Sequence, residues 1–91
     1  MKEMTLRVVK VGELTSVKSE KSESGQLEKR MLVLQELGGK YEPTYVVNLF
    51  GNQATLHFDE GELVVATLQF RSREYNGALY QDIVATEIIK R

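Results

Sequence analysis

The sequence predicts an all-β domain in which five strands close into a Greek-key barrel, with one short helix between strands three and four. Apolar and polar residues alternate along several segments with the period of two that a half-buried strand requires. An Asn-Gly pair at positions 76 and 77 separates two such segments and supplies the positive φ values of a tight hairpin turn. The 91 residues contain no linker and no internal repeat. We therefore expect a single domain spanning residues 1–91.

The first third of the chain predicts one long strand followed by a loop. Residues 6–17 alternate, but the pattern slips at Val8 and Val9, and Gly12 follows, which indicates a β-bulge or a sharp bend. Residues 18–28 are polar without an apolar period, so they predict a mobile loop. The second strand is expected over residues 30–37, before a turn at Gly38 and Gly39.

The remaining elements follow in order. A third strand is expected over residues 44–50, with Pro43 at its entry, where a missing N–H does least harm. A helix of about one and a half turns is expected within residues 52–60, with Asn52 as its N-cap. Strands four and five are expected over 62–71 and 78–89. This order of elements is that of an OB-fold, a five-stranded Greek-key barrel.

Composition limits the kinds of site and the cellular locations that we expect for the protein. The absence of cysteine excludes disulfides, thiol catalysis and thiolate metal sites. No segment approaches the ~20 apolar residues of a membrane span, and the first residues lack the apolar run of a signal peptide, so a cytoplasmic protein is expected. The net charge of −1, from 12 basic and 13 acidic residues, counts against a wholly basic surface. Whether a basic groove forms then depends on where the fold places the basic and the acidic residues.

The predicted hairpin carries the first set of candidate functional residues. Its turn brings Arg71, Arg73, Tyr75 and Tyr80 to one rim, and cations beside aromatic rings are suited to holding a single-stranded nucleic acid. Two other interpretations remain open. The arginines and Glu74 also fit a solvated, self-paired strand end, which is the more common case for surface charge, and Tyr75 can pack across the hairpin onto Tyr80.

A second candidate set surrounds the loop between strands one and two. Lys18, Lys21, Lys29 and Arg30 bracket this loop, which is a usual oligonucleotide contact in OB-folds. The alternative is a polar loop without a ligand.

The phenylalanines are first expected in the core. The alternation of a small barrel directs one face of each strand inward, and this applies to Phe50, Phe58 and Phe70.

An enzyme is not expected, and neither is a metal, a cofactor or a small-molecule substrate. His57 is the single histidine and has no cysteine partner, so it predicts neither a metal site nor a catalytic triad. Asp59, Glu60 and Glu62 are typical of a polar turn before a strand. The sequence offers no nucleophile paired with a base.

Several stretches resemble bacterial single-stranded-DNA-binding proteins. They are Gly12–Thr15 with Ser24-Gly25, Val46–Ala54, Phe70–Tyr75 and Tyr80–Ala85. The short length and Asn52–Ala54 are also similar to primosomal replication protein N, a compact dimeric relative. The hairpin is similar to that of short, uncharacterised OB-fold proteins with a Ser-Arg-Glu-Tyr-Asn-Gly turn.

This resemblance implies roles for individual residues. Phe50 falls where those proteins stack a base, which makes it the expected exception among the phenylalanines. Tyr75 falls at the aromatic of their loop between strands four and five, with Arg71 and Arg73 at basic positions on the same rim. The aromatic near the start of their strand three corresponds to Tyr45, or to Tyr41. Two features depart from the family: tryptophan is absent and the hairpin loop is reduced to a tight turn.

Together these observations predict a sequence-tolerant protein that binds single-stranded nucleic acid in replication, repair or recombination, with DNA as the expected ligand and RNA as the alternative. Bases would stack on aromatic rings while basic side chains follow the phosphates. The alternative is a protein-interaction or assembly module that has kept the barrel without the ligand. A homodimer is also expected, because the core is small and strands such as Met31–Leu34 and Val64-Val65 carry apolar residues on both faces.

Overall fold

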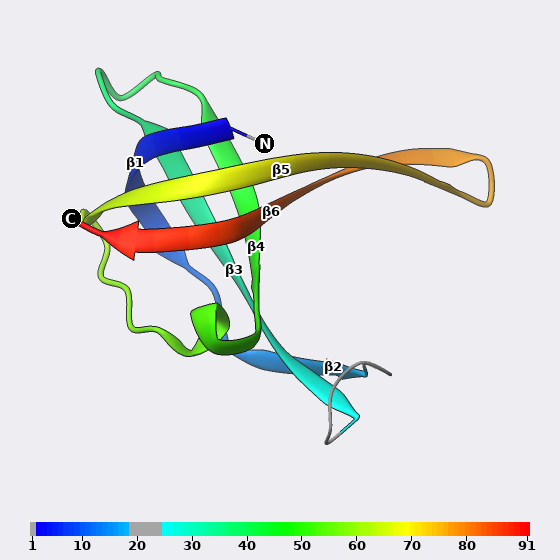
Figure 1. Ribbon diagram of the computed structural model, residues 1–91. Coiled ribbons are helices and arrows are strands. Elements are labelled where there is room, and N and C mark those ends of the chain that lie inside the picture. The colour runs from blue at the N-terminus through cyan, green and yellow to red at the C-terminus, as the bar shows by residue number, and fades with distance from the viewer. Residues whose placement is uncertain (1, 19–24) are drawn as a thin grey trace.

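The computed structural model describes residues 2–18 and 25–91, and within them a single sheet of six strands (Figure 1). The strands are β1 (Lys2–Val11), β2 (Thr15–Lys18), β3 (Gln26–Glu36), β4 (Thr44–Phe50), β5 (Leu63–Tyr75) and β6 (Ala78–Lys90). Their order is β1-β5-β6-β4-β3-β2, and β1 also pairs with β3. Five strands therefore form a closed ring, which confirms the predicted all-β class.

The ring is antiparallel except at one seam. β1 pairs with both β3 and β5, β3 pairs with β4, and β5 pairs with β6, all antiparallel. The ring closes where β4 and β6 run parallel, with Asn48 beside Val84. β2 lies outside the ring and pairs with the first residues of β3.

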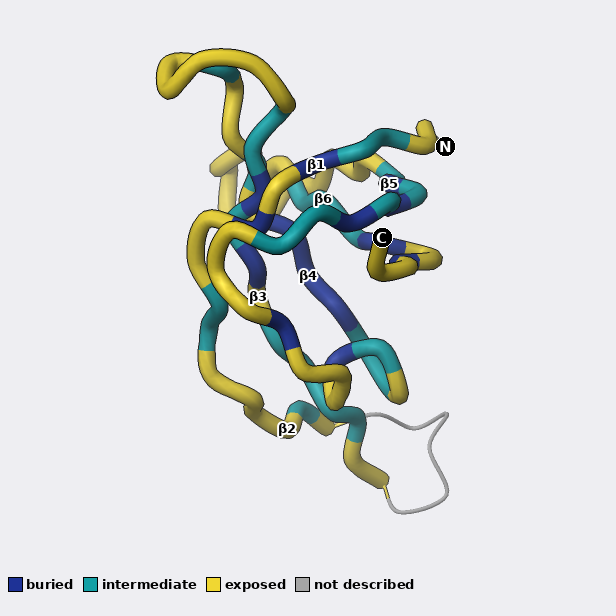
Figure 2. The backbone as a smooth tube through the Cα atoms, turned by 90° about the vertical axis from the view of Figure 1, so that its left-hand side faces the viewer, coloured by how far each residue is buried: buried dark blue, intermediate teal, exposed yellow. Residues whose placement is uncertain are grey.

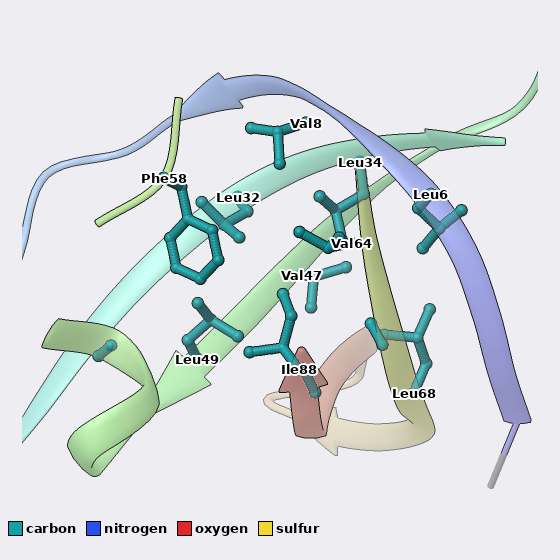
Figure 3. Packing of buried hydrophobic residues seen from close by; sticks show 13 residues of the cluster. Leu6, Val8, Leu32, Leu34, Val47, Leu49, Phe58, Val64, Leu68 and Ile88 are labelled. Carbon is teal, nitrogen blue, oxygen red and sulfur yellow. The ribbon is translucent and has the colours of Figure 1, made fainter. Parts of the chain in front are cut away.

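Alternate residues of every ring strand point inward and form one core (Figure 3). β1 contributes Leu6 and Val8, and β4 contributes Val47 and Leu49, all fully buried. β3 adds Leu32 and Leu34 and β5 adds Val64, Ala66 and Leu68, so these strands follow the period of two. β6 adds Ala85 and Ile88, three positions apart, because the register of β5 with β6 shifts beside them. Phe58 joins this core at 4 % exposure, as predicted. Phe70 does not, because it lies on β5 beyond the packed part of the barrel and is 45 % exposed.

The first predicted strand, over 6–17, is instead two strands that begin earlier, at Lys2. The pairing register of β1 with β3 shifts between Val8 and Lys10, which confirms the predicted bulge. A break then separates β1 from β2 at Gly12, whose N–H donates to the Met31 carbonyl at 2.8 Å. A Cβ atom at position 12 would lie 2.7 Å from that oxygen, so this close approach of two strands requires glycine.

The expected helix over 52–60 is wrong in length and type. Only a 3-10 turn, η1 (Gly51–Thr55), is present. The residue before it is Phe50, with no side-chain cap, so Asn52 is not the N-cap, and Leu56 is already extended. The turn buries a single side chain, Ala54. Packing of one small side chain does not offset the free-energy cost of nucleating an α-helix.

The hairpin prediction is confirmed, and the hairpin is longer than expected. Asn76 and Gly77 both have positive φ, 52° and 80°, as a two-residue turn of type I′ requires. β5 continues to Tyr75 rather than ending at Arg71. The distal halves of β5 and β6, residues 70–83, project from the barrel as a two-stranded ribbon (Figure 1). Figure 2 shows the contrast between the buried ring and the exposed outer segments.

Of the loop expected over 18–28, residues 19–24 lie outside the described part of the chain, and so does the candidate Lys21. β3 already begins at Gln26 instead of Arg30. The shorter connection follows from the pairing of Lys18 with Gln26, which continues the sheet past the ring.

Candidate functional site

A pocket opens on the outer face of the ring, where β3, β4, β6 and the base of the ribbon meet. Its volume is about 230 Å³. It brings together four of the residues that the sequence singled out, and three that it did not. The lining residues are Lys29, Asn48, Phe50, Arg71, Arg73, Asp82 and Val84.

Alternation and register explain why these side chains share one face. Residues directly opposite each other in an antiparallel pair project to the same side. Lys29 lies opposite Phe50, and Asn48 precedes Phe50 by two positions on β4. Arg71 lies opposite Asp82 in the ribbon. The parallel seam then sets Asn48 beside β6 and joins the two halves of the pocket.

Phe50 provides the aromatic surface of the pocket. It is only partly buried, unlike its neighbour Leu49, because it is the last residue of β4 and faces outward. The Lys29 Nζ lies 5.9 Å from the centre of the Phe50 ring. A cation over the ring face is a favourable arrangement, so a positive charge and an aromatic surface lie together in the pocket.

The two arginines are held in place by neighbours on the same face. Arg71 donates to the Gln69 Oε1 from Nε at 3.1 Å and from Nη2 at 2.6 Å. Arg73 pairs with the Asp82 Oδ2 at 2.7 Å, and its guanidinium lies 4.8 Å from the centre of the Tyr80 ring. The ion partner of Arg73 is thus Asp82 across the ribbon, rather than Glu74. The pocket contains three cations and one carboxylate, although the chain as a whole carries −1.

Asn48 lies at the parallel seam and is 8 % exposed. Its Nδ2 donates to the Ile83 carbonyl at 3.1 Å. Its Oδ1 is enclosed and accepts no hydrogen bond from any residue within 2–18 or 25–91. Buried polar atoms in folded proteins normally have a partner.

Tyr75 lies farther along the ribbon than the pocket, at 64 % exposure. It follows Arg71 and Arg73 at alternate positions of β5, so it shares their face. Its cross-strand neighbour is Ala78, whereas Tyr80 lies opposite Arg73. The tyrosine pair considered from the sequence is therefore replaced by the contact between Arg73 and Tyr80.

Three other candidates lie away from the pocket. Tyr45 lies opposite Leu34 and packs against the core, with its ring 6.3 Å from that of Phe70. Arg30 donates from Nε to the Ala54 carbonyl at 2.9 Å and so supports η1. Lys18 ends β2 opposite Gln26, on the face of β3 away from Lys29.

The phenol of Tyr45 is also engaged. It donates to the Glu36 Oε2 at 2.6 Å. This hydrogen bond, followed by partial burial and the charge of Glu36, raises the pKa of Tyr45 above its ordinary value. A tyrosine bound in this way has a structural role on the inner side of β4.

A second pocket adjoins the first at Lys29, which lines both. Its volume is about 360 Å³, and it runs between β2 and β3. The residues around it are Gly12, Glu13, Thr15, Val17, Lys29, Arg30 and Met31. The two pockets together extend the outer face beyond the size of one nucleotide.

The sequence interpretation missed Asn48, Asp82 and Val84. Counting outward from the Asn-Gly turn would have found Asp82, because a two-residue turn fixes Arg71 opposite it. Alternation along β4 would have placed Asn48 on the face of Phe50. No sequence signal marks the parallel seam that brings Val84 to the same place.

No helix in the described segments is long and apolar enough to cross a membrane. Within residues 2–18 and 25–91, no group of three acidic or histidine side chains could hold a metal ion. Comparisons with protein-family models, with curated proteins and with solved structures give no match.

Proposed function

We propose that this protein binds single-stranded nucleic acid, with DNA as the ligand, on the outer face of the ring, and that it acts in replication, repair or recombination. One observation carries the proposal: Lys29, Arg71 and Arg73 line one pocket together with Phe50. A stacking surface beside phosphate-binding cations is what sequence-tolerant binding of single strands requires.

The path of the chain supports an OB-fold. If β1 and β2 are counted as one interrupted strand, the ring follows the order one-two-three-five-four with a parallel pair between strands three and five. OB-folds bind oligonucleotides on the face of strands two and three, which here are β3 and β4. The pocket lies on that face. We infer kinship with the single-stranded-DNA-binding proteins that the sequence resembles.

The distribution of charge supports the same ligand. Near-neutral net charge argues against a protein that binds phosphates over its whole surface. Here the excess of cations is local, because the pocket has three cations against Asp82 alone. Such sorting suits a narrow path for one strand rather than a broad face for a duplex.

The ribbon extends this path. Four residues along β5 separate Arg71 from Tyr75, or about 13 Å at the rise of a β-strand. A strand of nucleic acid that leaves the pocket along the ribbon would pass Arg73 and reach the exposed ring of Tyr75. Arg73 is already oriented for a phosphate by Asp82 and Tyr80. A few nucleotides would span the whole surface.

A specific observation also favours the alternative, a protein-interaction module. The opposite face of the ribbon carries apolar side chains, with Leu79 at 80 % and Phe70 at 45 % exposure. Exposed apolar residues on a projecting element are typical of protein contacts. The two functions use opposite faces of the same ribbon, so they can be separated by experiment.

The proposal is tested by fluorescence anisotropy with a labelled oligo-dT at two salt concentrations. If all three pocket cations contact phosphates, the affinity should fall with salt with a log–log slope of about −2, at about 0.7 per contact. Arg73→Ala should weaken binding and make the slope less steep by about 0.7.

A duplex of the same length serves as the control and should bind more weakly. Absence of oligo-dT binding at low salt would reject the proposed function in favour of the interaction module. If Arg73→Ala and the parent bind with the same salt slope, Arg73 contacts no phosphate and the nucleic acid does not follow the ribbon.

A further inference from the structure

One buried atom in the pocket has a hydrogen-bonding capacity that the protein does not use. The Oδ1 of Asn48 is enclosed and accepts no hydrogen bond within the described residues, 2–18 and 25–91. Leaving an acceptor buried without a partner costs free energy. Such an atom in a native structure therefore calls for an explanation, and a ligand donor is one.

The orientation of the amide follows from its surroundings. The Nδ2 donates to the Ile83 carbonyl at 3.1 Å. If the amide were reversed, its oxygen would face a carbonyl oxygen, which is repulsive. The Oδ1 is consequently the end that remains for a ligand, and Asn48 belongs to the lining of the pocket beside Phe50.

The chemistry of DNA limits what can donate to this atom. Phosphates at neutral pH and the ring oxygen of deoxyribose are acceptors. Within a DNA strand, the N–H groups of the bases are therefore the donors available to an acceptor such as Asn48. All four bases carry them at or beside the edge used in Watson–Crick pairing: thymine at N3, guanine at N1 and N2, adenine at N6 and cytosine at N4.

We propose that Asn48 accepts a hydrogen bond, through Oδ1, from the Watson–Crick edge of an unpaired base stacked on Phe50. This inference rests on the proposed function and makes it more specific. In thymine and guanine the ring N–H is engaged in a base pair, so a duplex does not offer it. Asn48 thus selects unpaired bases while tolerating different sequences.

Access to Oδ1 requires side chains to move. The atom is enclosed in the free protein, and the Lys29 Nζ lies over the face of Phe50 at 5.9 Å. A base that stacks on this ring displaces the Lys29 ammonium, which can then follow a phosphate. Stacking and the contact with Asn48 form in the same event.

Three labelled homopolymers of equal length test the inference on the intact protein: oligo-deoxyuridine, oligo-thymidine and oligo-N3-methyl-deoxyuridine. Thymidine adds a methyl group at C5, away from the pairing edge, whereas N3-methylation replaces the donor hydrogen. Because every base is modified, whichever base enters the pocket carries the change. We expect similar affinity for the first two and a loss of roughly threefold to tenfold for the third, the range of one hydrogen bond.

The variant Asn48→Leu provides the second arm, because leucine has a similar size and no acceptor. It should bind the N3-methylated and unmodified strands with a ratio near one. Equal affinity of the parent for all three strands would overturn the inference while the proposed function stands. An equal loss in parent and variant would also overturn it, since the methyl group would then merely clash.

Failure of the parent to bind any of the three strands would reject the proposed function, and the role of Asn48 with it. Asn48→Leu also loses the hydrogen bond to Ile83, so its unfolding is measured first. If that variant does not fold, the three strands on the parent decide: a selective loss for the N3-methylated strand supports the inference and its absence overturns it.

Discussion

The three phenylalanines of this protein occupy three different environments. Phe58 is in the core, Phe50 lines the pocket, and Phe70 lies on the inner side of the projecting ribbon. Phe50 and Phe70 both sit in alternating strands, so alternation alone does not separate them, and Phe58 sits in a segment whose spacing suggests a helix. Their positions relative to the ends of the ring decide which is covered, and those ends are set by pairing between distant segments.

The contrast between two of them gives a direct test of the interface. Phe50→Ala should weaken oligo-dT binding by about 1–3 kcal/mol, because a stacking surface is lost, and should leave the salt slope unchanged, because no cation is removed. Phe70→Ala is the matched control, since it removes the same type of side chain, 45 % exposed, from the opposite face of the sheet. If Phe70→Ala weakened binding and Phe50→Ala did not, the nucleic-acid interface would instead lie on the face of the ribbon that carries Leu79. Anisotropy titrations of both variants make the measurement.

Tyr45 leads to a prediction about pH. Its pKa is raised in the folded protein, chiefly by the hydrogen bond to Glu36. The folded state therefore holds the phenol proton more tightly than the unfolded state, whose pKa is about 10. The resulting stability is fully present below pH 10 and is lost as the pH rises through the folded pKa.

We expect Tyr45→Phe to lower the free energy of unfolding by about 1 kcal/mol at neutral pH, through loss of this bond. Urea titrations between about pH 8 and pH 11 should show the parent approaching the variant at the alkaline end. A constant difference across this range would mean that the hydroxyl contributes nothing that titrates.

At the scale of elements, local chemistry identified some segments and not others. β4 and the hairpin turn were predicted at their observed positions, because Pro43 and the Asn-Gly pair mark their ends. The sequence predicted a longer helix than η1, because Leu56 and Phe58 have helical spacing. In the structure both residues lie after the end of η1. Phe58 enters the core from an extended segment, an arrangement that helical periodicity cannot reveal.

The candidate site was likewise predicted only where local sequence marks it. The ribbon arginines and Phe50 were identified from alternation and resemblance, and they meet in one pocket. The sequence did not indicate that Arg30 supports η1 or that Asn48 keeps an unpaired oxygen. Both depend on contacts between segments that are distant in the chain.

The break between β1 and β2 yields a prediction about stability. Gly12→Ala should lower the free energy of unfolding by about 1–3 kcal/mol, because the new Cβ would lie 2.7 Å from the Met31 carbonyl and one strand must shift. Gly39→Ala is the control. No heavy atom of the described residues lies within 4 Å of a Cβ there, so a change within about 0.5 kcal/mol is expected. Urea denaturation of both variants measures the difference, and equal effects would contradict the close approach.

For the whole molecule, the sequence predicted the class of fold better than the arrangement of charge. The totals of 12 basic and 13 acidic residues do not show where cations gather, and the sequence analysis placed Lys29 in a different candidate set from the two arginines. The ring joins the two sets by bringing Lys29 from β3 beside Arg71 and Arg73 of β5. Sorting of this kind is a property of the closed sheet and has no counterpart in the linear order of residues.

We propose that the protein is a homodimer in solution. Ile89 is 54 % exposed on the outer face of β6, opposite Val65 of β5 and away from the pocket, and a small core benefits from further burial. Light scattering at tens of micromolar should therefore give twice the chain mass of 10.4 kDa. A mass of one chain would refute the dimer, and Ile89→Lys should dissociate it if this face is the contact.

The parallel seam between β4 and β6 also determines how the edges of the sheet are protected. Without residues 78–90, the remaining pairings leave an open sheet in the order β5-β1-β3-β4. Its two outermost strands then expose unpaired N–H and C=O groups, which invite pairing with other chains. β6 covers both strands at once. A chain in which this one segment is removed or detached would therefore present two free sheet edges, and we expect it to aggregate.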